Sequence, residues 1–282
     1  MILVTGATGD IGGDVVRQLV AAGESVRALA RDPARAAKLG PAVEVTRGDL
    51  LQPDTLAAAF AGVTKLFLMA HAGDLPLVAE HALAAAKRAG VRHVVLLSSS
   101  TTLIEPLVTI GKWHLAAEQQ LEATGLSWTM LRPGNFASNA LRWAPMIKAR
   151  GAVFAPLGPG KSAPIDPHDI ASVAVKALTT PGHEGKKYVL TGDELLSAAE
   201  QVDILGAALG KPLRFVEVPA ANARAAMLES GMDEVFADAM LELFSLSRAG
   251  GEALRTSTVR EVTGAAPRTF AEWVRAHLSA FA

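Results

Sequence analysis

The sequence predicts an α/β fold in which a Rossmann-like, doubly wound parallel sheet is followed by a smaller, mostly helical C-terminal lobe. Three observations support this prediction. Short apolar strands alternate with amphipathic helices through the first half of the chain, a glycine-rich turn joins the first strand to the first helix, and the alternation loosens near residue 150. We therefore expect a nucleotide-binding domain over residues 1–150 and a substrate-binding lobe over residues 151–282. No Ser- or Pro-rich linker separates the two, so the lobe is predicted to be integrated rather than independent.

The first strand, Met1–Thr5, leads directly into a glycine turn and then into an amphipathic helix that ends at Ala22-Gly23. In such a turn one glycine adopts a backbone conformation closed to other residues, one lets a pyrophosphate approach the main chain, and one lets the helix pack close to the strand. The free amides and the dipole of the helix N-terminus then hold the phosphates. The expected cofactor-binding residues here are Gly6, Thr8, Gly9, Asp10, Ile11 and Gly12. The alternative is a glycine turn with a purely structural role.

Five further strands continue the alternation. The predicted strands are Ser25–Ala30, Val43–Thr46, Thr64–Met69, His93–Leu97 and Ser127–Leu131. The predicted helices between them are Ala34–Leu39, Pro53–Phe60, Leu75–Ala89 and about Lys112–Thr124. In the smaller lobe we expect short strands at Ala152–Ala155 and Lys187–Leu190, with helices beginning at Pro167 and Ser197. Right-handed crossovers then give a doubly wound sheet, whose ligands bind at the carboxyl ends of the strands.

Composition narrows the function. The formal charge of −1, without a long basic run, gives no electrostatic argument for nucleic acid or a membrane surface, so a small-molecule partner is expected. The absence of cysteine excludes disulfides and thiolate chemistry, and no His, Asp and Glu cluster has the spacing of a metal site. With no apolar run long enough to span a bilayer and no basic leader, we expect a cytoplasmic protein that is a monomer or a homodimer.

Several linked motifs occur in a fixed order along the chain. They are TGATGDIG at the N-terminus, ARDPARA, GDLLQPDTL, LSSS, HLAAEQQLEATGLSWTMLRPGNF, PIDPHDIA and LGAALGKPLRFVEVP. Through them the chain resembles, essentially end to end, the NmrA-like, atypical branch of the short-chain dehydrogenase/reductase family. This resemblance implies a Rossmann-like domain and NAD(P)H. It also implies either reduction of small conjugated or aromatic acceptors, as in quinone, azo-dye and triphenylmethane-dye reductases, or redox sensing without turnover.

The residues that follow the second strand indicate whether the protein binds NADPH or NADH. In NAD-specific sites an acidic residue at this corner binds the ribose 2′-hydroxyl, but here Arg31 comes first, with Arg35 and Lys38 beyond it. A guanidinium can hold a 2′-phosphate with two parallel hydrogen bonds, so we expect NADPH. If Arg31 is only a solvated loop residue and Asp32 meets the ribose, the protein uses NADH or both. Asp49 and Leu50 match the family's position beside the adenine, although an ordinary turn aspartate is the alternative for Asp49.

The tyrosine and lysine that mainstream members of the superfamily use for proton transfer are missing. The only tyrosine, Tyr188, falls in the predicted second lobe. Counting on from Ser100 by the interval that the family keeps between its serine and tyrosine leads to His114, and Glu118 lies one helical turn further. A histidine that titrates near neutrality can donate a proton or orient an acceptor, so His114 and Ser100 are the candidate catalytic residues. The alternatives are a structural histidine and a proton that comes from water.

Residues at the carboxyl ends of the later strands are expected to line the nicotinamide. They are Ala70, His71, Ser98, Pro133 and Asn135. Phe136, Trp143 and Trp113 are expected in the acceptor pocket, where Met146 and Phe154 would add to an apolar wall, unless these side chains are plain core. The aspartates of Asp166-Pro167-His168-Asp169 and the pair Ser197 and Glu200 are interpreted as helix caps.

The sequence therefore predicts an NADPH-dependent oxidoreductase that transfers hydride to a small conjugated or aromatic acceptor, including an enone or ketone. A nucleotide-binding sensor without turnover is the alternative, since the missing tyrosine permits it.

Overall fold

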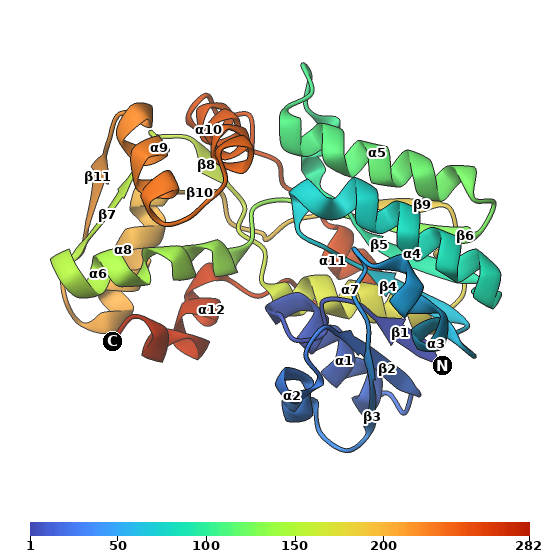
Figure 1. Ribbon diagram of the computed structural model, residues 1–282. Coiled ribbons are helices and arrows are strands. Elements are labelled where there is room, and N and C mark those ends of the chain that lie inside the picture. The colour runs from blue at the N-terminus through green and yellow to red at the C-terminus, as the bar shows by residue number, and fades with distance from the viewer. The chain divides into compact units, whose positions relative to one another are not determined.

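A computed structural model describes residues 1–282, which form two compact units (Figure 1). Unit 1 comprises Met1–Thr102, Gly111–Pro133 and Pro167–Val189. Unit 2 comprises Leu103–Ile110, Gly134–Asp166 and Leu190–Ala282. The units are interleaved in sequence, whereas the predicted organisation places one boundary at residue 150. None of the helices combines the length and the apolar composition that a membrane span requires.

Unit 1 is built on a seven-stranded sheet in the order β3-β2-β1-β4-β5-β6-β9. Its strands are β1 (Ile2–Val4), β2 (Val26–Ala30), β3 (Val43–Arg47), β4 (Lys65–Leu68), β5 (His93–Leu97), β6 (Ser127–Pro133) and β9 (Lys186–Leu190). The pairings from β3 to β6 are parallel. The chain begins at the centre, moves to one edge and returns to β4, so the order reverses between β1 and β4. Sheets of this kind bind ligands at the carboxyl ends of the strands beside that reversal.

The last strand, β9, also runs parallel to its neighbour β6. Backbone bonds join Gly185 N to the oxygen of Trp128 and Gly134 N to the oxygen of Leu190, so residue numbers rise together on both strands. Tyr188 lies on β9 and therefore belongs to the sheet of unit 1, not to the smaller lobe as predicted. Its hydroxyl lies 2.9 Å from Nδ1 of His183.

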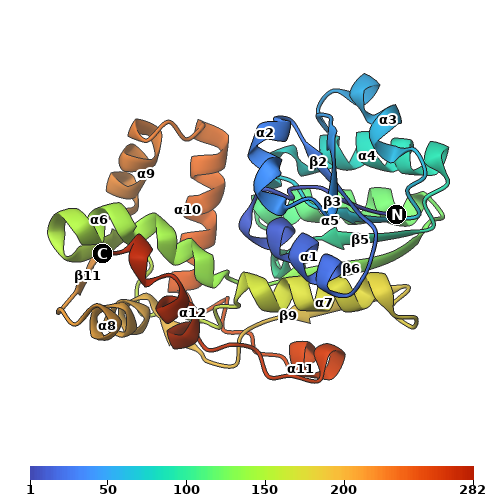
Figure 2. The ribbon, with the colours of Figure 1, turned by 90° about the horizontal axis from the view of Figure 1, so that it is seen from below.

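Helices cover both faces of this sheet, with α1 and α7 on one face and α4 and α5 on the other (Figures 1 and 2). The helices are α1 (Asp10–Ala21), α2 (Pro33–Ala36), α3 (Leu56–Phe60), α4 (Leu75–Ala89), α5 (Thr109–Ala123, its first turn in unit 2) and α7 (Pro167–Thr179). Short 3₁₀ turns are η1 (Ala37–Leu39), η2 (Pro53–Thr55), η3 (Ala72–Asp74) and η4 (Ser100–Leu103). The predicted doubly wound architecture is thus confirmed.

The core of unit 1 lies between the sheet and these helices. Leu3, Leu66 and Leu96 on neighbouring strands are fully buried, and α4 adds Leu75 and Ala82. On the opposite face α7 packs along α1, where the Ser172 hydroxyl donates to Gln18 at 3.1 Å. Strands buried on both faces read as continuous apolar runs, which explains why their positions could be predicted.

Unit 2 contains two small sheets and a group of helices. The strand β7 (Ala152–Ala155), at the predicted position, runs parallel to β11 (Arg214–Glu217), and β8 (Lys161–Ser162) runs antiparallel to β10 (Leu196–Ser197). The helices are α6 (Ala144–Arg150), α8 (Ala198–Leu209), α9 (Ala220–Glu229), α10 (Glu234–Arg248), α11 (Thr258–Thr263) and α12 (Phe270–Ala276), with 3₁₀ segments η5 (Ala137–Trp143) and η6 (Leu278–Ala280).

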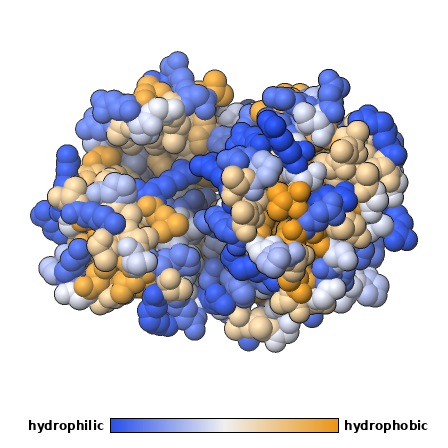
Figure 3. Space-filling view, turned by 60° about the horizontal axis from the view of Figure 1, so that its bottom comes forward, coloured by the Kyte–Doolittle hydropathy of each residue, from blue (hydrophilic) through white to orange (hydrophobic).

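The core of unit 2 is aromatic at its centre. Trp273 is 1% exposed, stacks on Phe270 with ring centroids 5.6 Å apart, and meets Phe281 edge-on. The predicted capping box at the start of α8 is confirmed, because Ser197 and Glu200 each bond the other's backbone amide. On the face shown in Figure 3, hydrophilic and hydrophobic side chains are interspersed over the surface of each unit.

Candidate functional site

Two glycines of the turn between β1 and α1 are required by the geometry. Gly6 has a φ of +63°, and a Cβ added there would lie 2.7 Å from Cγ of Met69. A Cβ on Gly12 would lie 2.2 Å from the carbonyl oxygen of Gly6, closer than any real contact. The turn therefore depends on the absence of side chains, as the sequence predicts.

Gly9 has a different role, because it leaves the start of α1 open. It is the N-cap residue, and no side chain caps the helix. A Cβ on Gly9 would meet only the oxygen of Gly6, at 3.4 Å, so the space in front of it is free. Thr8, Gly9 and Asp10 are exposed. The amides of the first turn of a helix have no intrahelical acceptor, so those of Asp10, Ile11 and Gly12 are available to an anion.

The carboxyl ends of β1 and β4 are joined by Thr5, which was not among the residues predicted for the site. Its hydroxyl donates to the Met69 oxygen and accepts from the Met69 amide, both at 2.8 Å, and the side chain is buried. This bond fixes Met69 against Gly6. A threonine that directly precedes the glycines is the sequence signal for it.

The corner after β2 carries exposed positive charge. Arg31, Arg35 and Lys38 are exposed, and no ion pair engages them. The carboxylate of Asp32 instead caps α2 by accepting the Ala34 amide at 3.0 Å. Because one Asp32 oxygen is used inside the protein, the arrangement favours Arg31 as the group that meets a phosphate here.

The corner after β3 is organised by its own hydrogen bonds. Oδ1 of Asp49 accepts the Leu51 amide at 3.0 Å, and the Asp49 amide donates to the Thr55 hydroxyl. The carbonyl of Leu50 lies 2.8 Å from Nδ1 of His81 on α4. Asp49 thus has the hydrogen bond of a turn aspartate, which was the alternative considered for it. Its second oxygen has no hydrogen bond in the structure.

After β4, Ala70 is half-buried and His71 is exposed at the start of η3. The rings of His71 and Trp113 both border Gly73, since a Cβ there would lie 3.7 Å from Nδ1 of His71 and 3.9 Å from Cη2 of Trp113. The structure therefore brings Trp113 beside this loop of unit 1 rather than into the pocket of unit 2 described below.

A buried polar network follows β5 and β6. The Ser98 hydroxyl donates to Oε1 of Glu118 at 2.5 Å, and Arg132 donates to both Glu118 oxygens at 2.9 and 2.5 Å. Glu118 is 0% exposed, Ser98 2% and Arg132 8%. The Ser98 side chain is therefore committed to the interior, so only its backbone is left to contact a ligand. Ser100, by contrast, is half-buried at the start of η4.

His114 lies one turn before Glu118 on α5. Its Nδ1 is buried without a hydrogen-bond partner. Burial lowers the pKa of His114 to about 4, against the opposing effect of the Glu118 charge. The prediction that His114 titrates near neutrality is therefore wrong, because an imidazolium at this position would have to form in a desolvated site. At neutral pH the ring is uncharged.

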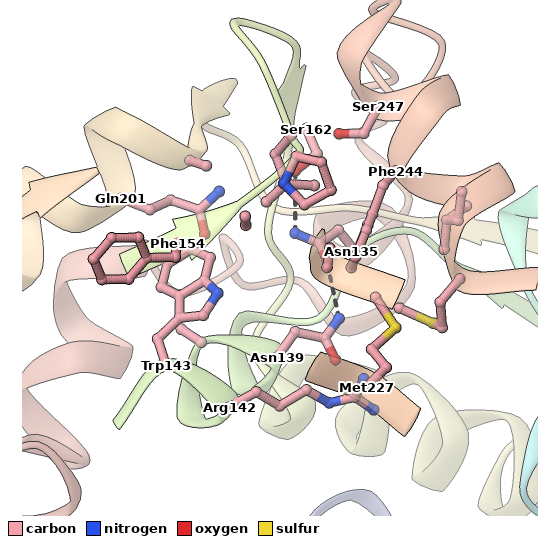
Figure 4. Close-up of a pocket in the computed structure, with 18 of the residues that line it drawn as sticks. Asn135, Asn139, Arg142, Trp143, Phe154, Ser162, Gln201, Met227, Phe244 and Ser247 are labelled. Carbon is pink, nitrogen blue, oxygen red and sulfur yellow. Dashed lines mark hydrogen bonds between the residues drawn. The ribbon is translucent and has the colours of Figure 1, made fainter. Parts of the chain in front are cut away.

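Unit 2 contains a pocket with a cavity volume of about 500 Å³. Trp143 and Phe154 form one side of it, and Met227 of α9 and Phe244 of α10 form another (Figure 4). Its polar groups are Asn135, Asn139, Arg142, Ser162, Gln201, Ser230, Ser247 and Glu252. Cavities of this size, mostly apolar with a few polar groups, are typical of small-molecule sites.

Part of this lining could be predicted from the sequence. Trp143, Met146 and Phe154 were expected there and lie there. Asn135 was assigned to the cofactor, but its side chain faces this pocket and bonds Ser162 at 3.1 Å. Phe136 pairs with Ile165 in an isolated bridge and is not part of the lining. The contributions of α9 and α10 were missed, because nothing in their helical pattern distinguishes pocket from core.

A family model described as NAD(P)H-binding matches residues 6–181, which include the glycine turn and the strands β2 to β6. The chain belongs to the NAD(P)H-binding family. The glycine turn fits this group, since its close approach of backbone to backbone and its uncapped helix start are what a pyrophosphate needs. The predicted cofactor class, NAD(P)H, is thus confirmed.

Relatives within this family match along the full length of the chain. An NAD(P)H azoreductase of Xenophilus azovorans is 43% identical over 288 residues, covering 100% of this chain and 99% of the relative. The structure of an NADPH-dependent quinone oxidoreductase of Escherichia coli, complexed with NADPH, is 29% identical, with a TM-score of 0.87 over 99% of this chain and 100% of that one. The NADP(H) complex of triphenylmethane reductase from Citrobacter sp. is 28% identical, with a TM-score of 0.82 over 96% and 97% of the two chains.

Proposed function

We propose that this protein is an NADPH-dependent oxidoreductase that transfers a hydride to a small conjugated or aromatic acceptor, such as a quinone, an azo compound or a dye cation. The pocket of unit 2 carries the proposal, because its aromatic and thioether walls suit a flat apolar molecule. A sensor that only reads the redox state of the cofactor needs no second small-molecule pocket. The full-length relatives named for azo, quinone and dye reduction support the same acceptor class.

We assign the cofactor to unit 1. Main-chain amides of the glycine turn would hold the pyrophosphate, Arg31 the 2′-phosphate, and the backbone around Asp49 and Leu50 the adenine. The remaining predicted contacts around the nicotinamide are Ala70, His71, the Ser98 backbone and Pro133. When bound, a reduced nicotinamide supplies the hydride.

The chain's own contribution is binding and orientation. The pocket excludes water from an apolar acceptor and presents a few polar groups that fix its position. His114 is uncharged at neutral pH, so it can orient a ligand by hydrogen bonding but does not act as an imidazolium acid. With neither an imidazolium nor the YxxxK pair, we propose that the proton comes from water and that the half-buried Ser100 hydroxyl positions the acceptor or that water.

The test follows NADPH absorbance with purified protein against quinones, azo dyes, triphenylmethane dyes, enones and ketones, with NADH in parallel. Saturable oxidation of NADPH with at least one conjugated acceptor is expected. Tight NADPH binding without turnover on the whole panel would overturn the oxidoreductase in favour of the sensor. Failure to bind either cofactor would overturn both.

The expected cytoplasmic location and the monomeric or homodimeric state belong to this proposal as well. Cell fractionation and light scattering of the purified protein, with and without NADPH, test them.

A further inference from the structure

Resting on the proposed function, we propose that Arg142 makes the pocket of unit 2 selective for acceptors that carry an anionic substituent, such as a sulfonate, carboxylate or phosphate. The substituent would bind the guanidinium while the conjugated body of the acceptor occupies the apolar part of the pocket.

The charge of the pocket comes from two ionisable side chains in its lining, Arg142 and Glu252. Burial raises the pKa of Glu252, against the opposing effect of a hydrogen bond from Ser247, so the site favours the neutral form of this carboxyl more than water does. The arginine stays charged under all ordinary conditions. Arg142 is therefore the fixed charge of the pocket.

Arg142 lines the pocket and has no carboxylate partner, in contrast to three other cations on the elements that surround it. On α9, Arg224 binds Asp238 and Glu234 at 2.6 and 2.5 Å. On α10 Arg248 pairs with Glu217, and on β8 Lys161 pairs with Glu200 at 2.7 Å. The charges of these three cations are thus neutralised within the protein. Lys148 and Arg150 of α6 do not line the pocket, so Arg142 is the cation of the lining whose charge is left for a ligand.

Amide groups beside Arg142 are held in place by a short relay. Nδ2 of Asn139 donates to Oδ1 of Asn135 at 2.8 Å, and Nδ2 of Asn135 donates to the Ser162 hydroxyl at 3.1 Å. A side-chain amide has two N–H groups, so Asn139 retains one. In Figure 4, Arg142 runs past Asn139 toward Met227, so the guanidinium and this amide lie on one side of the pocket.

This arrangement suits a planar anion attached to a flat ring system. The guanidinium offers two parallel N–H groups to a pair of anionic oxygens, which a neutral group cannot exploit equally. Trp143 and Phe154 border the same cavity and offer aromatic faces to the ring. A cavity of about 500 Å³ accommodates a substituted naphthalene.

The experiment compares two unreactive probes by isothermal titration calorimetry, naphthalene-2-sulfonate and the uncharged naphthalene-2-sulfonamide. Wild type is measured beside Arg142→Met and Lys148→Met. Lys148 is an exposed cation of α6 that does not line the pocket, so its replacement changes the net charge equally and controls for long-range electrostatics. Arg142→Lys tests whether the fork of the guanidinium matters beyond its charge.

We expect the wild type to prefer the sulfonate and Arg142→Met to reduce that preference by roughly tenfold, as for the loss of a charged hydrogen bond at an exposed site. Lys148→Met should keep the preference, and Arg142→Lys should retain only part of it. An unchanged preference in Arg142→Met, an equal loss in Lys148→Met, or no preference in the wild type would each overturn the proposal.

Because the probes are not turned over, this result is separate from that of the activity assay. Reduction of neutral quinones by a wild type without anion preference would leave the oxidoreductase standing and remove the role of Arg142. Sulfonate binding that depends on Arg142, in a protein that reduces no acceptor, would support the recognition site and remove the proposed reaction.

Discussion

Arg132 of unit 1 and Arg142 of unit 2 are used in opposite ways. Arg132 is 8% exposed, and both of its hydrogen bonds go to the buried carboxylate of Glu118. Arg142 is exposed, lines a cavity and has no carboxylate partner. An arginine matched inside the protein supports the fold, whereas one left unmatched at a cavity is available to a ligand.

The two units also differ in whether main chain or side chains form their sites. In unit 1 the nucleotide is expected to meet main chain, shaped by glycines where no side chain fits. In unit 2 the lining consists largely of side chains brought from η5, α6, β7, β8, β10, α8, α9 and α10. A site made of main chain should fail abruptly where an added Cβ collides with the backbone, and a site made of side chains should lose affinity in increments.

The largest effect on stability is expected when the buried ion pair between Arg132 and Glu118 is broken. Glu118→Leu leaves the guanidinium buried without its acceptor, which should lower the free energy of unfolding by about 3–5 kcal/mol. Urea denaturation followed by circular dichroism measures it. The double variant Glu118→Leu/Arg132→Met should recover part of the loss, since apolar replacement of both partners removes the buried charge.

The control is Arg224→Met, which breaks an ion pair at the surface of unit 2. It should change the free energy of unfolding little, because exposed pairs gain little over solvation. If Glu118→Leu were no more destabilising than Arg224→Met, the buried network would have no structural role and the contrast between the two arginines would be wrong.

The next effect separates two glycines of the same turn. Gly12→Ala places a Cβ 2.2 Å from the Gly6 oxygen, so we expect a stability loss of about 1–3 kcal/mol together with loss of NADPH binding. Gly9→Ala meets only one atom, at 3.4 Å, so it should keep the melting temperature and weaken NADPH alone. Thermal unfolding and NADPH fluorescence titration measure the two properties. Full NADPH affinity in Gly9→Ala would place the pyrophosphate elsewhere.

A smaller effect is expected at the corner after β2. Arg31→Ala should weaken NADPH by about 1.5–3 kcal/mol, the value of a charged hydrogen bond, and change NADH affinity little. The matched control is Lys38→Ala, a nearby exposed cation further along the chain. Dissociation constants for both cofactors measure this difference. Equal losses of affinity for NADPH and NADH in Arg31→Ala would contradict the assignment of Arg31 to the 2′-phosphate.

The smallest effect at neutral pH is expected for His114→Leu, because the wild-type ring is already uncharged there. The difference should appear in acid. The folded pKa of about 4 lies below the ordinary 6.5, so the unfolded chain binds more protons between these values, and stability falls as the pH is lowered from 6.5 toward 4. His114→Leu should flatten this slope. Urea denaturation across the window measures it, and a slope equal to that of the wild type would show that the ring titrates normally.

Elements of unit 1 could be predicted because local pattern and final environment agree. The apolar runs of β4 and β5 are buried on both faces, and the glycine turn is a contiguous stretch whose spacing reflects its geometry. Ser197 and Glu200 were found for the same reason, since a capping box is local.

The rest depends on contacts between distant segments. Glu118 and Arg132 meet across a helix and a strand, and nothing in the pattern of α5 shows that one of its glutamates is fully buried. Burial also removed the neutral-range titration expected of His114. Met227 of α9 and Glu252, which follows α10, line the same pocket although the whole of α10 separates them in the sequence, and only the three-dimensional arrangement of unit 2 reveals this.

The interleaving of the units has a consequence for synthesis. The strand β9 pairs with β6, and the helix α7 covers α1, but both follow more than thirty residues of unit 2 in the chain. The sheet of unit 1 is therefore incomplete until synthesis has reached residue 189. While the chain emerges from the ribosome, β6 therefore remains an open edge and the apolar face of α1 remains uncovered. A chain truncated near residue 150 would keep that exposed edge permanently and should aggregate rather than fold as a separate nucleotide-binding domain.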